Sequence, residues 1–333
     1  MSGEAVPYHL RQNKHVDRQL FMELLTHLNR YLPVRDSFYV GFGGVYFEDF
    51  KLIHSMFGTE EMLSIEEQPW LIDRQKYNAP LGYIECVEMK SRKLVNEIEL
   101  IRETRVDKQL ICWLDFAAAN KRRSQLEEVS SLIKNCREND VLRITLNANA
   151  DTLGSQRDGE LAEDRDLRRL QALRDDLGDK VAGEVEIKDV TKEGFPSTLV
   201  KILRLEVARA MRSRPDLEFQ PLGCYSYSDS LHTMLTVTGI LLRPELIPSF
   251  MQATGLKNCE FTSLLWQLRH INVPLLSQRE KLALDQKFGT ESPDEMAKSL
   301  GFQLDKKKDT STKMLRDYFE YHRFYPHFHR IQY

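Results

Sequence analysis

The sequence predicts an α/β protein with a doubly wound, mostly parallel sheet, and three observations lead to this fold class. Strand-like and helix-like segments alternate between residues 37 and 146. A glycine-rich turn, Gly41–Gly44, joins the first strand to the helix that follows. Near residue 230 a short polar connection separates two strand-like runs, which is typical of an antiparallel hairpin. Together these features predict seven strands, with the last strand antiparallel beside the fifth.

The alternation rests on the spacing of apolar residues in each segment. Residues 13–31 place leucines and a valine at intervals of three and four, which indicates an amphipathic helix. Pro33 ends that helix before the first strand begins. Strands are expected at 37–40, 62–66, 81–87, 109–114 and 141–146, with helices at 46–57, 92–101 and 124–136.

The second half of the chain is expected to complete the sheet and then to become helical. Residues 151–215 are densely charged at first but keep a leucine stripe, so we interpret them as a charged helical insertion that ends in a helix at 196–211. We expect an N-terminal helical segment (1–36), a sheet domain (37–245) and a C-terminal helical region (246–333). The hairpin is expected at 222–227 and 233–242, and later helices at 248–254, 261–270, 277–288, 294–300 and 310–325.

Composition places the chain among ordinary globular proteins. Of its 333 residues, 41% are apolar and 29% are charged, and a net charge of -3 gives no overall field that would attract nucleic acid. The five cysteines are widely spaced, which favours reduced core residues over disulfides or a zinc site. Neither a signal peptide nor a stretch of roughly 20 apolar residues is visible, so we expect a cytoplasmic protein without a membrane partner.

The glycine-rich turn and the acidic end of the next strand form the candidate cofactor site. A Cβ at Gly41 or Gly43 would occupy the space through which a cofactor approaches the backbone. Glu66 ends the second strand about 25 positions after Gly41, where a carboxylate can accept hydrogen bonds from ribose hydroxyls. A glycine turn alone is a weak signal, since such turns also occur for backbone reasons, and the acidic strand end strengthens it.

Three motifs, in this order, resemble those of the Rossmann-like S-adenosylmethionine-dependent methyltransferases. They are YVGFGGVYFEDF for the glycine loop, MLSIEEQ for the ribose-binding acid and ICWLDF for the fourth strand, and they lie within residues 37–242. The whole chain is also similar to bacterial O-methyltransferase-like proteins, some linked with phage defence, through LRQNKHVDRQLF, GFGGVYFEDF and HRFYPHF. The resemblance implies a Rossmann-like domain at 37–245, S-adenosylmethionine as cofactor and methyl transfer to an oxygen acceptor.

The resemblance also implies roles for individual residues. Glu66 would bind the ribose, and the region of Glu85 and Glu88 would lie beside adenine. Asp115 would face the reacting methyl group and help to orient or deprotonate the acceptor. The loop that binds the cofactor would consist of Gly41, Phe42, Gly43 and Gly44. Gly41 and Gly43 would lie at the methionine portion of the cofactor.

Departures from the family pattern leave other functions open. Val45 stands where many relatives carry a further glycine, and neither a Pro-Pro-Tyr nor a Pro-Cys motif of base-modifying enzymes is present. One alternative is therefore a catalytically inactive subunit of a larger complex, such as an antiviral assembly. A weaker alternative is a nucleic-acid modifying or sensing protein that uses lysines near Lys306 and the aromatic tail with Phe328 and His329. Docking of that tail on the core is the favoured explanation.

Polar residues after the fourth and fifth strands raise the question of a metal. Asp115, Asn147, Asn149 and Asp151 stand where metal-dependent O-methyltransferases hold their ion, and oxygen ligands of this kind suit magnesium. Turn geometry also explains the two asparagines, and Asp151 can cap a helix. We favour these structural roles and expect no metal site.

The first helix carries a cluster of basic residues, Arg11, Lys14, His15 and Arg18. They precede the glycine strand and could contact a phosphate or an acidic partner. A solvated helix face is the favoured explanation, because charged residues on a helix usually face water. The sequence therefore predicts no functional role for these side chains.

Overall fold

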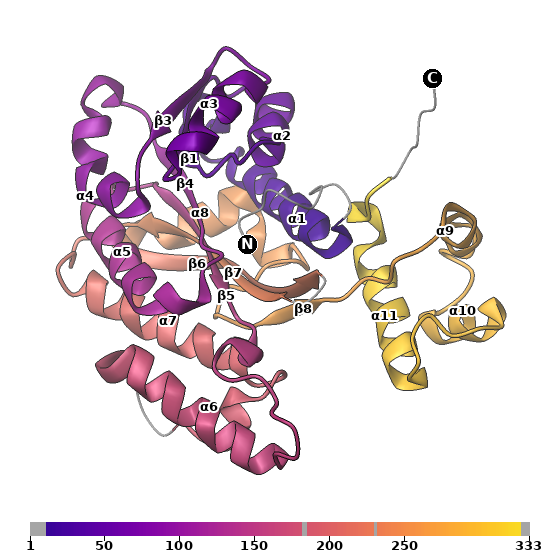
Figure 1. The fold of residues 1–333 in the computed structure, drawn as a ribbon. Coiled ribbons are helices and arrows are strands. Elements are labelled where there is room, and N and C mark those ends of the chain that lie inside the picture. Colours follow the sequence, from indigo (N-terminus) through magenta and orange to yellow (C-terminus); the bar gives the residue numbers. More distant parts are fainter. Residues whose placement is uncertain (1–10, 182–184, 230–231, 328–333) are drawn as a thin grey trace.

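The structure is a computed structural model that describes residues 11–181, 185–229 and 232–327, and it contains the predicted α/β fold (Figure 1). Its strands form one sheet in the order β3-β2-β1-β4-β5-β7-β6-β8. Ser230 and Leu231 of the predicted hairpin connection, and Phe328 and His329 of the aromatic tail, lie outside the described residues. The strands are β1 (Phe38–Gly41), β2 (Glu61–Glu66), β3 (Ile84–Glu88), β4 (Leu110–Asp115), β5 (Val141–Asn147), β6 (Glu218–Asp229), β7 (His232–Leu242) and β8 (Arg269–Ile271).

Strand pairing reproduces the predicted doubly wound order and adds one strand. Strands β1 to β5 are parallel, so their carboxyl ends meet at one edge of the sheet. Strand β7 pairs antiparallel with both β5 and β6, which confirms the expected position of the last hairpin strand. Strand β8 extends the sheet beyond the seven predicted strands by pairing parallel with β6.

The predicted helix at 261–270 is wrong, because this segment ends in β8 and contains no helix. Its leucines and tryptophan imitate a helical stripe in the sequence. Trp266, however, has a left-handed backbone with φ of 64°, which interrupts any right-handed helix. Strand β8 itself has three residues, too few for an alternating pattern to identify it.

Helices cover both faces of the sheet (Figure 1). Phe38 and Val40 of β1 point into one apolar cluster with the helices α4, α5 and α7, while Tyr39 between them points into a second cluster with α1, α2 and α8. The helices are α1 (Gln12–Leu28), α2 (Glu48–Phe57), α3 (Pro69–Asn78), α4 (Ser91–Ile101), α5 (Arg122–Asn135), α6 (Ala162–Leu177), α7 (Phe195–Met211) and α8 (Ile247–Thr254).

One of these helices was missed in the sequence, and another lies in the charged segment. Helix α3 was not expected, since Trp70 and Tyr77 are exposed on it and blur its apolar stripe. Helix α6 lies in the charged segment 151–215, yet its residues Leu173 and Leu177 are fully buried in the same cluster as α5 and α7. The leucine stripe expected from the sequence is therefore the face of α6 that packs on the core.

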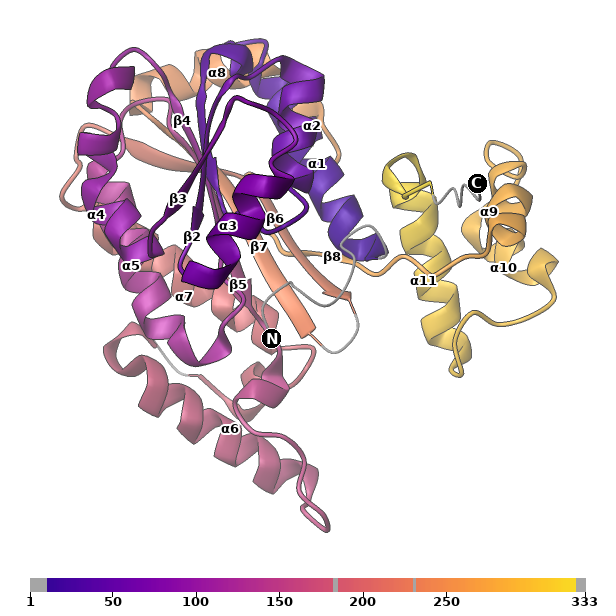
Figure 2. The same ribbon diagram turned by 45° about the horizontal axis from the view of Figure 1, so that its top comes forward.

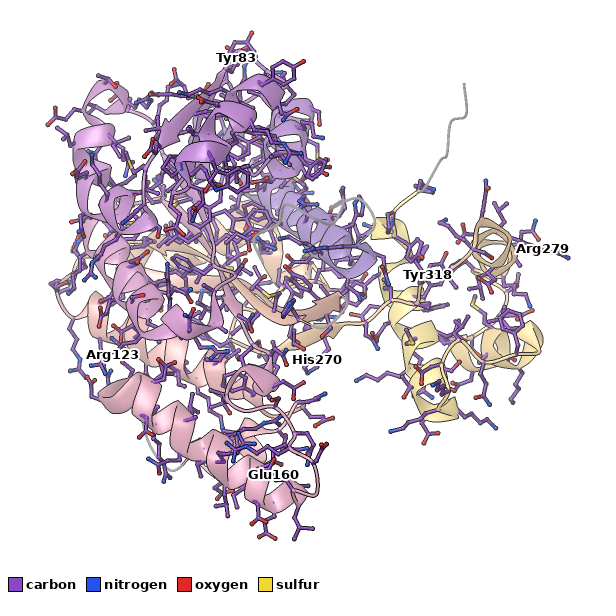
Figure 3. The ribbon with its side chains drawn as sticks, in the orientation of Figure 1. Tyr83, Arg123, Glu160, His270, Arg279 and Tyr318 are labelled. Atoms are coloured by element: carbon purple, nitrogen blue, oxygen red, sulfur yellow. The ribbon has the colours of Figure 1, made fainter. Side chains whose placement is uncertain are left out.

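The C-terminal helices stand apart from the sheet as a small group (Figure 2). Tyr318, which is labelled in Figure 3, is fully buried and donates a hydrogen bond to Asp285 at 2.6 Å. The group joins the core through an apolar cluster shared with Val16 of α1 and Tyr227 of β6. No helix among the described residues is long and apolar enough to cross a membrane. The three helices are α9 (Gln278–Asp285), α10 (Pro293–Leu300) and α11 (Lys308–Tyr321).

A buried ion pair fixes α1 against the sheet. Arg143 of β5 donates a hydrogen bond through Nη2 to the Asp17 carboxylate of α1 at 2.6 Å, and both side chains are fully buried. The guanidinium also lies over the rings of Phe21 and Trp113, at 4.6 and 4.5 Å from their centroids. The pair therefore determines which residues of α1 face the carboxyl edge of the sheet.

We expect Asp17→Asn to destabilise the protein by about 3–5 kcal/mol, because it leaves the buried Arg143 guanidinium without its counter-charge. The double change Asp17→Leu with Arg143→Met should lower the free energy of unfolding by less than Asp17→Asn does, since neither charge of the pair then remains buried. Chemical unfolding measures both. Glu99→Gln, which breaks the exposed pair with Arg137, is the control and should cost below about 1 kcal/mol. An Asp17→Asn variant as stable as the wild type would contradict the anchoring role.

Candidate functional site

The carboxyl edge of the parallel strands brings most of the predicted site residues together. Strand β1 ends at Gly41, β2 at Glu66, β3 at Glu88 and β4 at Asp115. Glu66 and Glu88 are register partners, so their backbones lie side by side. Motifs that are far apart in the sequence therefore meet at the edge where doubly wound sheets bind their ligands.

Glu85 is not brought to this edge. Its carboxylate pairs with Arg105 at 3.4 Å, and the same guanidinium pairs with Glu61, the first residue of β2, at 3.2 Å. Arg105 also lies over the ring of Phe38, the first residue of β1. Glu85 thus belongs to a charged cluster near the amino ends of the strands, and of the two predicted adenine-side acids only Glu88 lies at the carboxyl edge.

The loop after β1 is held by its own hydrogen bonds. The Gly43 N–H donates to Ser64 Oγ of β2 at 3.0 Å, and this hydroxyl in turn donates to Gln75 Oε1 of α3 at 3.1 Å. The Phe47 N–H donates to the Gly43 carbonyl at 2.9 Å as the chain turns into α2. Phe42 packs edge-on against Phe116 after β4. The loop is therefore fixed against β2 and β4 before any ligand binds.

The glycines of this loop are needed for reasons that differ from the expectation. A Cβ at Gly43 would lie 2.6 Å from the Phe47 ring and 2.7 Å from Ser64 Oγ, so the protein itself fills the space assigned to a cofactor. At Gly41 the nearest atom to a Cβ is the Tyr39 hydroxyl oxygen, at 3.1 Å. Gly44 has a left-handed φ of 56° with open space around its Cβ position. Gly44, rather than Gly41 or Gly43, is thus the glycine beside accessible space.

Glu66 is oriented by the start of the next helix. Its Oε1 accepts a hydrogen bond from the Gln68 N–H at 2.8 Å, immediately before Pro69 begins α3. The bond satisfies a backbone donor that the helix leaves unpaired and holds the carboxylate at the strand end. A carboxylate has lone pairs for several donors, so this contact is compatible with a further ligand hydroxyl.

Asp115 forms an ion pair with α1. Its Oδ2 accepts a hydrogen bond from Nζ of Lys14 at 2.9 Å, and the two side chains are 22% and 9% exposed. Burial alone would raise the pKa of Asp115, but Lys14, with Arg18 and Arg143 nearby, holds that pKa below its usual value. Asp115 is therefore a carboxylate at neutral pH and a weak base.

A pocket opens between α1, the glycine loop and the end of β4. Lys14 and Arg18, which the sequence assigned to a solvated face, are buried and line it, so that interpretation was wrong. Their spacing in the sequence could have indicated this burial, because both residues continue the helical row of the buried Phe21 and Leu25. The pocket lining includes Lys14, Arg18, Gly43, Tyr46, Glu48 and Asp115.

The polar residues after β5 have structural roles. Asn147 Oδ1 accepts from the Asn149 N–H at 3.0 Å, and Asn149 Oδ1 accepts from the Asp151 N–H at 3.1 Å, as in side-chain-capped turns. Asp151 pairs with Arg169 of α6 and, at 3.2 Å, with Lys192. Among the described residues no group of three or more acidic, histidine or cysteine side chains is placed to hold a metal ion.

We predict that Gly43→Ala destabilises the protein more than Gly44→Ala does. The new methyl at Gly43 would overlap Phe47 and Ser64 and force the loop to move, at a cost of about 1–3 kcal/mol. The same change at Gly44 meets no atom within 4 Å and costs about 1 kcal/mol, through its left-handed backbone alone. Thermal unfolding would give the order, with Gly82→Ala, which also meets nothing, as a neutral control. The reverse order would contradict the packing described here.

Several solved methyltransferase structures are similar to this chain at low sequence identity. The N-methyltransferase NodS from Bradyrhizobium japonicum WM9 shares 10% identity with a TM-score of 0.36, and the match covers 68% of this chain and 97% of that one. A SAM-dependent methyltransferase from Anabaena variabilis ATCC 29413 shares 9% at 0.37, covering 70% and 86%. The plantazolicin methyltransferase BpumL, in complex with SAH, shares 10% at 0.38, covering 68% and 86%.

The sequence comparison gives the family directly. No curated protein is significantly similar to the chain. The family model described as "Putative O-methyltransferase" matches residues 6–333, almost the full length. This match confirms the expected assignment to the O-methyltransferases. The chain therefore belongs to this O-methyltransferase family, and its glycine loop, acidic strand ends and pocket lie at the edge of the sheet where a cofactor is expected.

Proposed function

We propose that this chain transfers a methyl group from S-adenosylmethionine to an oxygen acceptor at the carboxyl edge of its sheet. The observation that supports it most is the meeting of the pocket, the glycine loop and Asp115 at the ends of β1 and β4. In a doubly wound sheet this is the place where a ligand can contact several strand ends at once. The cofactor would supply the reactive methyl group, and the chain would supply binding and alignment.

Binding of the cofactor is assigned to the acids of β2 and β3 and to the loop. Glu66, which Gln68 holds in place, would accept hydrogen bonds from the ribose hydroxyls. Glu88, its exposed neighbour on β3, would lie beside the adenine. The open space at Gly44 fits a ligand that passes close to the backbone. Glu85 receives no role here, since its ion pair with Arg105 holds it near the other edge.

Asp115 is assigned an orienting role. Its ion pair with Lys14 keeps it ionised and makes it a weak acceptor of protons. A fixed carboxylate at the end of β4 can still align an acceptor or a positively charged part of the cofactor through electrostatic attraction. Of the two roles expected from the sequence, orientation and deprotonation, the proposal therefore keeps the first.

The test is isothermal titration with S-adenosylhomocysteine, and we expect Glu66→Ala to weaken binding at least about tenfold. The physical reason is the loss of charge-assisted hydrogen bonds to the ribose, which are worth about 1.5–3 kcal/mol. Glu67→Ala is the matched control, because Glu67 is the next residue in the chain, is exposed and pairs only loosely with Lys121, at 3.9 Å. It should bind like the wild type.

The same titration can overturn the proposal. A wild-type protein that binds neither S-adenosylmethionine nor S-adenosylhomocysteine would favour the inactive subunit of a larger complex, and co-purification from the native host would then identify its partner. Equal affinities for wild type and Glu66→Ala would remove the ribose assignment. Glu85→Ala should leave the affinity unchanged, and a loss there would contradict its placement with Arg105.

A further inference from the structure

Arg18 is a buried cation without a hydrogen-bonded or ion-paired partner among the described residues. The residue is 4% exposed, lines the pocket together with Asp115, and has a buried Nε without a hydrogen-bond partner. Within residues 11–181, 185–229 and 232–327 no hydrogen bond or ion pair joins its guanidinium to another group. Burying a charge is costly unless something pairs with it. Asp49 and Asp115 attract Arg18 at longer range, but no described residue pairs with it directly, so Arg18 is placed to pair with an anionic ligand.

The carboxyl groups that share the pocket with Arg18 are engaged with other donors. Burial raises the pKa of Asp49 against the opposing attraction of Arg18, and this raised pKa favours the neutral form of the carboxyl group. The other two acids, Asp115 and Glu48, each form an ion pair with a lysine. None of the three carboxyl groups therefore contacts the Arg18 guanidinium directly. The three pairs are Asp115 with Lys14 at 2.9 Å, Glu48 with Lys51 at 2.6 Å, and Asp49 with the Tyr39 hydroxyl.

The chemistry of the pocket selects a carboxylate as the anion. A guanidinium presents its donors in a planar fork that matches the two oxygens of a carboxylate. A phosphate also fits such a fork, but it carries up to two negative charges and would be repelled by Asp115 and Glu48 in the same pocket. A group with a single negative charge satisfies Arg18 with the least repulsion.

A carboxylate acceptor also removes the need for a base. Lys14 holds Asp115 as a weak base. His15, next to Lys14 on α1, has its pKa lowered to about 4 by burial and by Arg18, so its imidazole is a weak base as well. An alcohol would have to lose a proton on methylation, whereas a carboxylate oxygen is already ionised at neutral pH.

We propose that Arg18 binds the carboxylate of the methyl acceptor, so that the enzyme forms methyl esters of carboxylic acids. This inference rests on the proposed methyl transfer and specifies its substrate class. The carboxylate oxygen attacks the methyl carbon, the new carbon–oxygen bond forms as the carbon–sulfur bond breaks, and the electron pair stays on sulfur. No proton is released. The methionine part of the cofactor carries a carboxylate too, so an experiment must distinguish whether Arg18 binds the acceptor or the cofactor.

Titration separates the two carboxylates. We would measure the affinities of wild type, Arg18→Gln and the exposed control Arg35→Gln for S-adenosylhomocysteine and for 5′-methylthioadenosine, which lacks the carboxylate. The proposal expects all affinities of Arg18→Gln to remain within about twofold of wild type. A tenfold loss for S-adenosylhomocysteine alone would show that Arg18 holds the cofactor, and would overturn the acceptor assignment.

The product identifies the acceptor class. Each protein would be incubated with methyl-labelled S-adenosylmethionine and a small-molecule extract of the native host, followed by alkali. Methyl esters release the label as volatile methanol, and Arg18→Gln should lower this release at least tenfold while Arg35→Gln does not. Label that resists alkali would overturn the inference while leaving methyl transfer intact. No label at all from a wild-type protein that binds the cofactor would overturn the proposed function itself.

Thermal unfolding distinguishes a binding role of Arg18 from a structural one. A buried charge without a partner does not stabilise the fold, so Arg18→Gln and Arg18→Met should unfold at or above the wild-type temperature. Retained stability together with lost ester formation supports the inference. A clear drop in unfolding temperature for both variants would assign Arg18 to the fold and contradict it.

Discussion

The buried contact between Asp17 and Arg143 is the constraint on which the site depends. It crosses from the first helix to the middle of the sheet, and two aromatic rings, Phe21 and Trp113, enclose the guanidinium. Because both charges are fully buried, each requires the other, and α1 has only one favourable position on the sheet. A helix held by apolar contacts alone could rotate or slide at much lower cost.

The fixed position of α1 explains the electrostatics of the pocket. Lys14, one helical turn before Asp17, lies at the end of β4 and pairs with Asp115. Arg18, the residue after Asp17, lines the pocket together with these two residues. The ends of strands β2, β3 and β4 carry acidic side chains, and α1 adds two basic side chains, Lys14 and Arg18, at the same edge of the sheet. One cation neutralises a strand-end carboxylate, and the other remains available for a ligand. The pocket consequently belongs to α1 as much as to the doubly wound sheet.

The sequence predicted the parts of this account that follow from local patterns. Alternating segments gave β1 to β5 and the hairpin of β6 and β7, and the acids Glu66 and Asp115 were placed correctly at strand ends. The rest depends on tertiary contacts. No local pattern indicates that Trp266 has a left-handed backbone or that Arg105 holds Glu85 away from the site. The helical row of Phe21 and Leu25 indicates that Arg18 is buried, but its position at the pocket depends on an ion pair between residues 126 positions apart.

A crystal structure of the protein with bound S-adenosylhomocysteine is the decisive measurement for this site, because it shows where α1 and the strand ends meet the ligand. We predict ribose hydroxyls within hydrogen-bond distance of Glu66, the sulfur near the pocket at Asp115, and α1 unmoved with the Asp17 pair intact. Arg18 should face open space beside the sulfur. A ligand bound away from the carboxyl edge, or an α1 displaced from Arg143, would rule out this arrangement of the site.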